Sequence, residues 1–142
     1  MDIGMQMSAG TADTVRLLLL GGGGAVDDDT LMRLYAYPAG LTRPLVRGNM
    51  IASIDGAATT TGTSGGLGGP GDRRLFALQR ELADVVVVGA GTARAESYGG
   101  VRLTAPQRQS RRERGQSEVP PIALVTRSGV LEHDLPVLTA SE

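Results

Sequence analysis

The stretch that decides the fold is Ala83-Asp-Val-Val-Val-Val-Gly-Ala-Gly-Thr92. A short, wholly apolar and β-branched run such as Val85–Val88 is typical of a central parallel strand that is buried on both faces. The glycines after it precede a predicted short helix over residues 92–97. In that context a Gly turn lets the backbone approach a pyrophosphate, with helix N–H groups directed at it. The third Gly of the Gly-x-Gly-x-x-Gly motif is replaced by Arg94, so a plain turn after a strand is an equal alternative.

The sequence on either side predicts alternating helices and strands. Helices are expected from the acidic run Asp27–Asp29 to Pro38, from Pro70 through Leu82, and over 92–97. Strands are expected at residues 44–54, 85–88 and 122–126, with a further one starting at 137–139. Asp55-Gly56 predicts a turn, and the Arg-rich stretch 102–118 predicts an exposed loop. This order predicts an α/β fold with a parallel sheet.

The chain has the length of one domain, 142 residues. Residues 1–26 show no periodicity and contain the run Gly21–Gly24, so they are predicted to form a flexible N-terminal tail. Residues 27–142 are predicted to be the N-terminal portion of one folded domain, for the reasons given below.

Composition excludes several kinds of chemistry. The chain has no Lys and no Cys, which rules out a P-loop lysine, a Schiff base, a thiol nucleophile and a thiolate metal site. A single His, His133, cannot build a multi-histidine site, so no metal is expected. The net charge of −1 and four aromatic residues argue against nucleic acid. Leu17–Leu20 is too short to span a membrane, so a cytoplasmic protein without a membrane partner is expected.

The end of the last predicted strand bears on cofactor choice. It reads Thr126-Arg127-Ser128 and contains no acidic residue. Folds that bind NAD tend to place Asp or Glu there for the ribose 2′-hydroxyl, whereas Arg and hydroxyl groups accommodate a 2′-phosphate. The tripeptide therefore favours NADP over NAD, with an ordinary turn as an alternative of equal weight.

Taken together, four segments resemble the reductase domain of riboflavin biosynthesis, the C-terminal half of bifunctional pyrimidine deaminase–reductases, in its divergent actinobacterial branch. The resemblance spans about 80 residues, and its motifs are modest singly but fairly specific in this order. The segments are Asn49-Met-Ile-Ala-Ser-Ile-Asp-Gly56, Gly68-Gly-Pro-Gly-Asp-Arg-Arg74, Ala83–Thr92 and Pro121-Ile-Ala-Leu-Val-Thr126.

The resemblance implies a dihydrofolate-reductase-like fold: a parallel-rich sheet with flanking helices. It also implies NADPH as the cofactor, and as the substrate a phosphorylated ribosylaminopyrimidine, whose ribosyl group is reduced to ribityl. The family's second diphosphate site, a strand followed by Glu-Gly-Gly and a helix, would lie after Glu142. The domain is therefore expected to be incomplete at its C-terminus, and a homodimer is expected where the full domain is present.

The family's functional positions map onto named residues of this chain. The residues expected to bind the cofactor are Ile51, Gly66, Gly89, Gly91, Thr92, Glu96, Thr126, Arg127 and Ser128. Those expected to contact the substrate are Ser64, Arg80 and Arg102, the two Arg being suited to its phosphate. Asp55 and Glu96 are the candidate catalytic residues. Each assignment has a plainer alternative. Asp55 would only form a turn, and Arg80, Arg102 and Glu96 would be solvated charges. The Gly-rich segment 62–71 would be a slack linker.

Departures from the family leave the substrate open. Ala57 stands where the family commonly has Lys, Gly66 where it has an aromatic residue, and Glu96-Ser97 where it has an acidic pair. A loosened pocket would accept another heterocycle, including a dihydropterin. The alternatives are therefore a dihydrofolate-reductase-like activity or a truncated, inactive NADP-binding fragment, with a Gly/Arg-rich nucleic-acid binder as the weakest.

Overall fold

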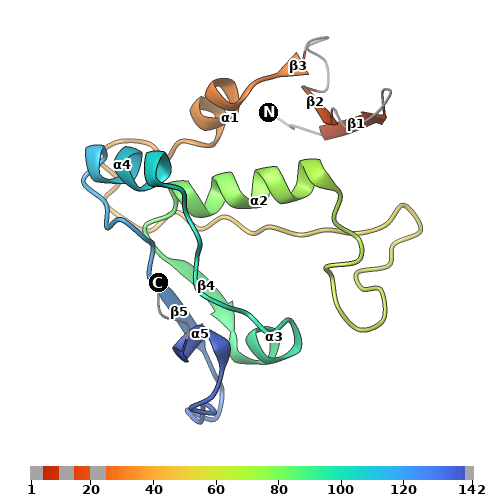
Figure 1. Ribbon diagram of the computed structural model, residues 1–142, viewed down its shortest axis with the longest axis vertical. Helices are drawn as coiled ribbons and strands as arrows, with labels where there is room; N and C mark the ends of the chain where they lie inside the picture. Colours follow the sequence, from red (N-terminus) through yellow and green to blue (C-terminus); the bar gives the residue numbers. More distant parts are fainter. Residues whose placement is uncertain (1–4, 10–14, 20–24, 140–142) are drawn as a thin grey trace. The chain divides into compact units, whose positions relative to one another are not determined.

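The computed structural model describes residues 5–9, 15–19 and 25–139. Contacts within the chain divide it into two compact units, and each is described by itself (Figure 1). The first consists of residues 1–49 and 68–82, and the second of residues 50–67 and 83–142. This division does not follow the predicted boundary at residue 26, and the predicted division into tail and domain stays a prediction.

The first unit begins with a three-stranded antiparallel sheet that the sequence did not predict. Its strands are β1 (Met5–Ala9), β2 (Val15–Leu19) and β3 (Ala25–Val26), in that order across the sheet. Met5 lies opposite Leu19, and Leu17 lies opposite Val26. The connector expected at 21–24 lies outside the described residues.

Helix α1 (Asp28–Tyr35) forms where the acidic run predicts it. Asp27 is the N-cap, and its Oδ1 accepts a hydrogen bond from the Thr30 amide at 2.8 Å. Such a cap satisfies one of the free N–H groups of the first turn. Leu31 is buried, whereas Leu34, expected on the same face, is 40% exposed.

Helix α2 (Pro70–Leu82) confirms the second predicted helix and supplies most of the core of this unit. Leu75, Leu78 and Leu82 recur at helical spacing and pack with Leu31 and Val26 in one buried cluster. Arg74 of α2 also donates from Nε to Asp28 Oδ1 of α1 at 2.6 Å. Apolar burial, with an ion pair at its edge, therefore joins the two helices.

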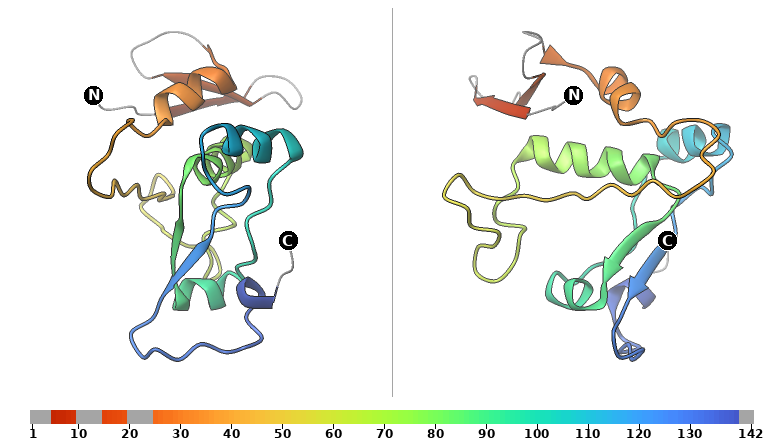
Figure 2. Two further views of the ribbon diagram at one scale, coloured as in Figure 1. Left: turned by 90° about the vertical axis from the view of Figure 1, so that its left-hand side faces the viewer. Right: turned by 180° about the vertical axis from the view of Figure 1, so that it is seen from behind.

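The second unit is built on a parallel pair of strands, β4 (Val86–Gly89) and β5 (Ile122–Val125). Val86 lies opposite Ile122 and Gly89 opposite Val125, so the carboxyl ends of both strands meet at one edge. Helix α3 (Ala90–Ala95) follows β4 at this edge, confirming the predicted short helix (Figure 2). The predicted α/β class with parallel strands is confirmed.

One feature of the β4 prediction is wrong. Val88 is buried, but Val87 is 61% exposed, so the strand is buried on one face and not on two. Val125, on the neighbouring strand, is 60% exposed. A β-branched run therefore identified the strand, but not the extent of its burial, because burial depends on elements remote in sequence.

The strand predicted over residues 44–54 is also wrong. This segment has no regular structure, and its apolar side chains Val46, Met50 and Ile54 are 84%, 89% and 110% exposed. A strand is held by hydrogen bonds to a neighbouring strand, and within the described ranges none pairs with this segment. Its apolar pattern alone cannot fix it as a strand.

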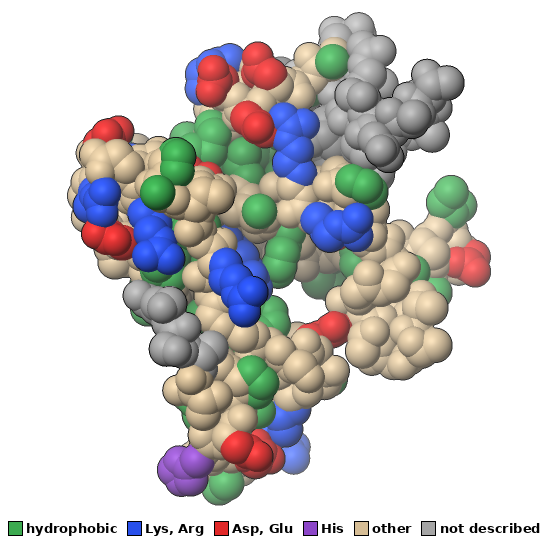
Figure 3. Space-filling view, viewed as in Figure 1, with side chains coloured by type: hydrophobic (Ala, Val, Ile, Leu, Met, Phe, Trp, Pro, Cys, Tyr) green, Lys and Arg blue, Asp and Glu red, His purple; other side chains and the backbone are tan. Residues whose placement is uncertain are grey.

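The exposed loop predicted over 102–118 contains helix α4 (Ala105–Glu113). A capping box begins the helix: Gln107 Oε1 accepts from the Thr104 amide at 2.9 Å, and Thr104 caps the N3 backbone. Over α4, Figure 3 shows basic and acidic side chains beside one another. The strand expected from 137 is instead the short helix α5 (Pro136–Thr139), which begins at a proline, a residue suited to the first position of a helix.

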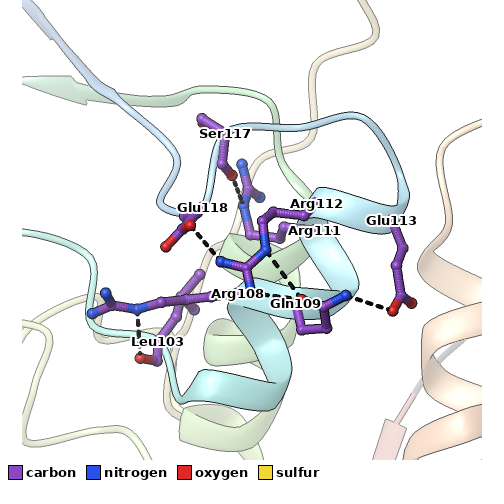
Figure 4. A network of polar contacts seen from close by, with 8 residues as sticks. All are labelled: Leu103, Arg108, Gln109, Arg111, Arg112, Glu113, Ser117 and Glu118. Atoms are coloured by element: carbon purple, nitrogen blue, oxygen red, sulfur yellow. Dashed lines mark hydrogen bonds and ion pairs between the residues drawn. The ribbon is translucent and has the colours of Figure 1, made fainter.

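Arg111 of α4 is the only large side chain that is wholly buried among the described residues. Its Nε donates to the Ser117 carbonyl and its Nη1 to the Ala83 carbonyl, both at 2.7 Å (Figure 4 shows the former contact). Ala83 lies just before β4, and Ser117 lies in the connection to β5. The Arg111 guanidinium thus links α4 to the segments that precede β4 and β5. These segments lie at the amino ends of the two strands, opposite the end where α3 lies (Figures 1 and 2).

Replacing Arg111 with Met should destabilise the chain strongly. Met retains much of the volume but removes the donors to the Ser117 and Ala83 carbonyl groups, and these two charge-assisted hydrogen bonds contribute about 3 kcal/mol to the free energy of unfolding. Urea denaturation followed by circular dichroism measures this. The matched control is Arg112→Met, because Arg112 is the exposed neighbour that pairs with Glu118, and such a pair contributes less than about 1 kcal/mol. Equal losses of unfolding free energy in the two variants would contradict this stabilising role of the Arg111 guanidinium.

Candidate functional site

A pocket of about 270 Å³ lies at the carboxyl ends of β4 and β5. Ligands of open α/β sheets bind at this edge, where loops leave the strands. Seven residues line the pocket, and none of them is acidic: Ala90, Gly91, Arg94, Val125, Thr126, Arg127 and Ser128. The structure therefore brings together Gly91 and the Thr126–Ser128 tripeptide, which the sequence placed in one cofactor site from positions far apart in the chain.

The tripeptide presents hydroxyl and guanidinium groups to this pocket. Thr126 Oγ1 and Ser128 Oγ lie 3.3 Å apart, and Ser128 Oγ accepts a hydrogen bond from the Val130 amide at 3.3 Å. The latter contact holds the turn after β5 without using the donor capacity of the Ser128 hydroxyl. Two hydroxyl groups and one fixed positive charge form a set suited to a phosphate monoester.

The Gly turn forms the other wall of the pocket. Gly89 is the N-cap of α3, and Thr92 lies in the first turn of that helix. A Cβ atom at Gly91 would meet no atom within 4 Å, so the absence of a side chain keeps that wall open. Neither Gly89 nor Gly91 has a positive φ angle, and a Cβ atom would fit at both positions, so the backbone of the turn does not itself require glycine.

Glu96 and Ser64, expected on the cofactor and the substrate respectively, are in direct contact. Glu96 Oε1 accepts from the Ser64 amide at 2.8 Å and from the Ser64 hydroxyl at 3.0 Å. Glu96 is the C-cap of α3, and Ser97 after it has a φ of 46°, in the left-handed region. The carboxylate therefore ties the Gly-rich segment to the end of α3.

The Gly-rich segment is folded and not slack. Thr60 and Thr63 exchange backbone hydrogen bonds of 2.8 and 3.2 Å, closing a two-residue turn. Thr61 and Gly62 both have positive φ, 54° and 86°, as the type I′ hairpin turn requires. A Cβ at Gly66 would lie 3.1 Å from Thr60 Cβ, so a larger residue would press on this hairpin. The slack-linker alternative is wrong for residues 60–66.

Asp55 lies in a tight turn, as expected for Asp-Gly. The Gly56 amide donates to the Ser53 carbonyl at 2.9 Å, and Gly56 has a φ of 89°. The Ser53 hydroxyl donates to Asp55 Oδ1, and this bond, with further help from backbone N–H groups of Asp55 and Ala57, holds the pKa of the Asp55 carboxyl below its ordinary value. Asp55 is exposed and ionised at neutral pH, so it can accept a proton or a hydrogen bond but does not serve as a proton donor.

The remaining predicted residues are distributed over both units. Ile51 is half-buried and Arg102 is exposed, both in the second unit. Arg80 belongs to α2 in the first unit, where its guanidinium lies 4.1 Å from the centre of the Phe76 ring. That stacking fixes the guanidinium plane, as in a cation–π contact.

Sequence reasoning missed one pair of residues at the pocket. Arg94 lines the pocket, and its Nη1 lies 3.1 Å from Glu132 Oε2. The pKa of the Glu132 carboxyl is lowered by its own backbone N–H and by Arg94. The only signal in the sequence was the replacement of the third motif Gly by Arg94, since Glu132 follows 38 residues later.

The described residues, 5–9, 15–19 and 25–139, contain neither a metal-binding cluster nor a membrane-spanning helix. No group of three or more His, Cys, Asp or Glu side chains is placed to hold a metal ion. No helix in these ranges is both long enough and apolar enough to cross a membrane.

Comparison with known proteins gives two positive findings. Residues 44–142 match the model of the RibD C-terminal domain. The fold is similar to the crystal structure of a pyrimidine reductase-like protein from Corynebacterium diphtheriae, with 37% identity and a TM-score of 0.55. The match covers 61% of this chain and 38% of that protein, so the chain spans less than two fifths of its length. No curated protein sequence matches the chain significantly.

Replacing Glu96 with Ala should release the Gly-rich hairpin. Losing hydrogen bonds to a charged acceptor should speed amide exchange at Ser64 by about tenfold or more, because each such bond is worth roughly 1.5–3 kcal/mol. Hydrogen–deuterium exchange followed by NMR measures the rate. Glu113→Ala is the control, since Glu113 bonds only Gln109 on the exposed side of α4 and its loss should leave Ser64 unchanged.

Replacing Ser53 with Ala should raise the pKa of the Asp55 carboxyl toward its ordinary value, because the largest cause of the shift is removed. A carboxyl whose pKa is lower in the folded state stabilises the fold above the ordinary pKa and loses that contribution as pH falls. The substitution should therefore reduce the acid dependence of stability. Carboxyl NMR titration measures the pKa, and an unchanged midpoint would contradict this assignment.

Proposed function

Because the chain belongs to the RibD C-terminal domain family, we propose that it carries the cofactor-binding part of an NADPH-dependent reductase of riboflavin biosynthesis. The observation that carries this proposal is the pocket at the ends of β4 and β5. Its lining combines a Gly wall with hydroxyl groups and guanidinium groups, and it has no carboxylate. That composition matches the requirements of a phosphorylated nucleotide.

The choice of NADPH over NADH rests on the residues that follow β5. A carboxylate at this position would hydrogen-bond a free ribose 2′-hydroxyl and would repel a 2′-phosphate. Arg127 between two hydroxyl residues favours the phosphate. In this assignment Arg127, Thr126 and Ser128 hold the 2′-phosphate, and Gly89, Gly91 and Thr92 lie along the diphosphate.

The proposed substrate is 5-amino-6-(5-phosphoribosylamino)uracil, whose ribosyl group would be reduced to ribityl. Support comes from the family and from the residues suited to a phosphorylated sugar. The residues expected to contact the substrate are Ser64 and Arg102 in the second unit and Arg80 in the first, and Arg has the forked donors that suit a phosphate. Ile51 and Gly66 would border the cofactor beside the substrate.

The nicotinamide cofactor, when bound, supplies the hydride. The residues of this chain contribute position and charge. Glu96 is a positioning residue, because it holds Ser64 against the end of α3 and so sets the distance between the substrate loop and the cofactor turn. Asp55, ionised at neutral pH, contributes a negative charge and orders the turn beside it, while the proton for the reduced sugar comes from another donor.

The test of this proposal is binding and turnover with matched cofactors. The 142-residue chain should bind NADPH at least tenfold more tightly than NADH, because one charge-assisted contact to the 2′-phosphate is worth roughly 1.5–3 kcal/mol. Turnover is followed by the loss of NADPH absorbance with the ribosylaminopyrimidine, and in parallel with dihydrofolate. Equal affinity for the two cofactors, or reduction of dihydrofolate alone, would overturn the proposal.

Arg127→Gln should reduce the preference for NADPH to near parity while NADH affinity stays within about twofold, because only the 2′-phosphate contact is lost. Isothermal calorimetry with each cofactor measures both affinities. Arg112→Gln removes the same charge from α4, outside the pocket lining, and should preserve the preference. A similar loss in both variants would show a general charge effect in place of a specific contact.

A further inference from the structure

The phosphate pocket has a second cation that the proposed function does not use. Arg94, on α3, lines the same pocket as Arg127, which follows β5. The two guanidinium groups come from segments 33 positions apart in the chain, and only the parallel pairing of β4 with β5 brings their segments to one pocket. Two fixed cations exceed what a free ribose hydroxyl needs, but they match the charge of a phosphate dianion.

Arg94 also makes an ion pair with a carboxylate. Its Nη1 is paired with Glu132 Oε2 at 3.1 Å, and the side chains of the two residues are 46% and 53% exposed. Glu132 is not part of the pocket lining. An ion pair this exposed is weak, worth at most about a fivefold change in an equilibrium constant, so a dianion can displace the carboxylate.

We propose that Arg94 is a second binding residue for the phosphate monoester in this pocket, and that Glu132 is a competing counter-ion that the phosphate must displace. This inference rests on the proposed function, because it assigns the phosphate to the cofactor's 2′ position. The ion pair lowers the affinity for the phosphate by the strength of the pair that is broken.

The inference predicts opposite effects for the two partners. Arg94→Gln should weaken binding of adenosine 2′-monophosphate by about tenfold or more, since one charged donor is lost. Arg94→Lys should fall between wild type and Arg94→Gln, because it keeps the charge but lacks the fork. Glu132→Gln should tighten binding by roughly threefold, because the competitor is removed.

The double variant separates competition from simple repulsion. If Glu132 acts by pairing with Arg94, Glu132→Gln should have no effect in a chain that already carries Arg94→Gln. If the threefold gain persists in that background, Glu132 only repels the anion through space and the competition is overturned. Arg112 and Glu118 provide the matched control: this pair lies outside the pocket lining, its side chains are 47% and 50% exposed, and Arg112→Gln and Glu118→Gln should each leave binding unchanged.

Titrations with two different phosphate ligands show whether the pocket binds the cofactor phosphate or the substrate phosphate. Adenosine 2′-monophosphate represents the cofactor, and ribose 5-phosphate represents the sugar phosphate of the substrate. NMR titration of the 142-residue chain, with amide spectra confirming that each variant folds, gives both affinities. Binding of adenosine 2′-monophosphate that depends on Arg94 supports the inference. Dependence on Arg94 for ribose 5-phosphate alone, no dependence for either ligand, or no binding of adenosine 2′-monophosphate overturns it.

Failure of the Arg94 inference can be told apart from failure of the proposed reductase function. Binding of adenosine 2′-monophosphate that depends on Arg94, together with reduction of dihydrofolate alone, would support the inference and contradict the function. Turnover that prefers NADPH, with an unchanged preference in Arg94→Gln, would do the reverse.

Discussion

The second unit depends on one buried guanidinium. Arg111 donates to carbonyl groups that precede β4 and β5, and its own side chain is wholly buried. A buried charge is tolerated only when its hydrogen bonds are made, so the geometry of these two carbonyl groups is fixed by the charge that they hold. The parallel register sets where the strands end, and the strand ends in turn place the two walls of the pocket.

Elements set by local chemistry could be predicted from the sequence. The Asp27 cap, the Leu repeat of α2 and the Val run of β4 each carry their own signal, and each element formed close to its expected place. Segment 44–54 could not be predicted, because an apolar extended segment becomes a strand only beside a partner. Helix α4 was missed although Thr104 and Gln107 spell a capping box, since the Arg-rich composition suggested a loop.

The positions of the candidate site were predicted in part, whereas the contacts between distant side chains were not. Gly91 was assigned to the cofactor site from the Gly turn after a strand, and the tripeptide after β5 from the residues expected at the end of the next strand. The pocket brings these positions together. The contact between Glu96 and Ser64 and the pair of Arg94 with Glu132 were not foreseen. Both join residues more than thirty positions apart, and their side chains meet only through the tertiary fold.

The pocket lies between two segments that are far apart in the sequence, residues 90–94 and 125–128. Residues 90–121 separate the strands, and this crossover, with α3 and α4 inside it, is closed when β5 pairs beside β4. Closing a long connection costs chain entropy before any contact compensates for it, and such non-local pairing is slow. The two walls of the pocket therefore meet late in folding. A partly folded chain in which β5 has not yet paired with β4 therefore lacks one wall of the pocket.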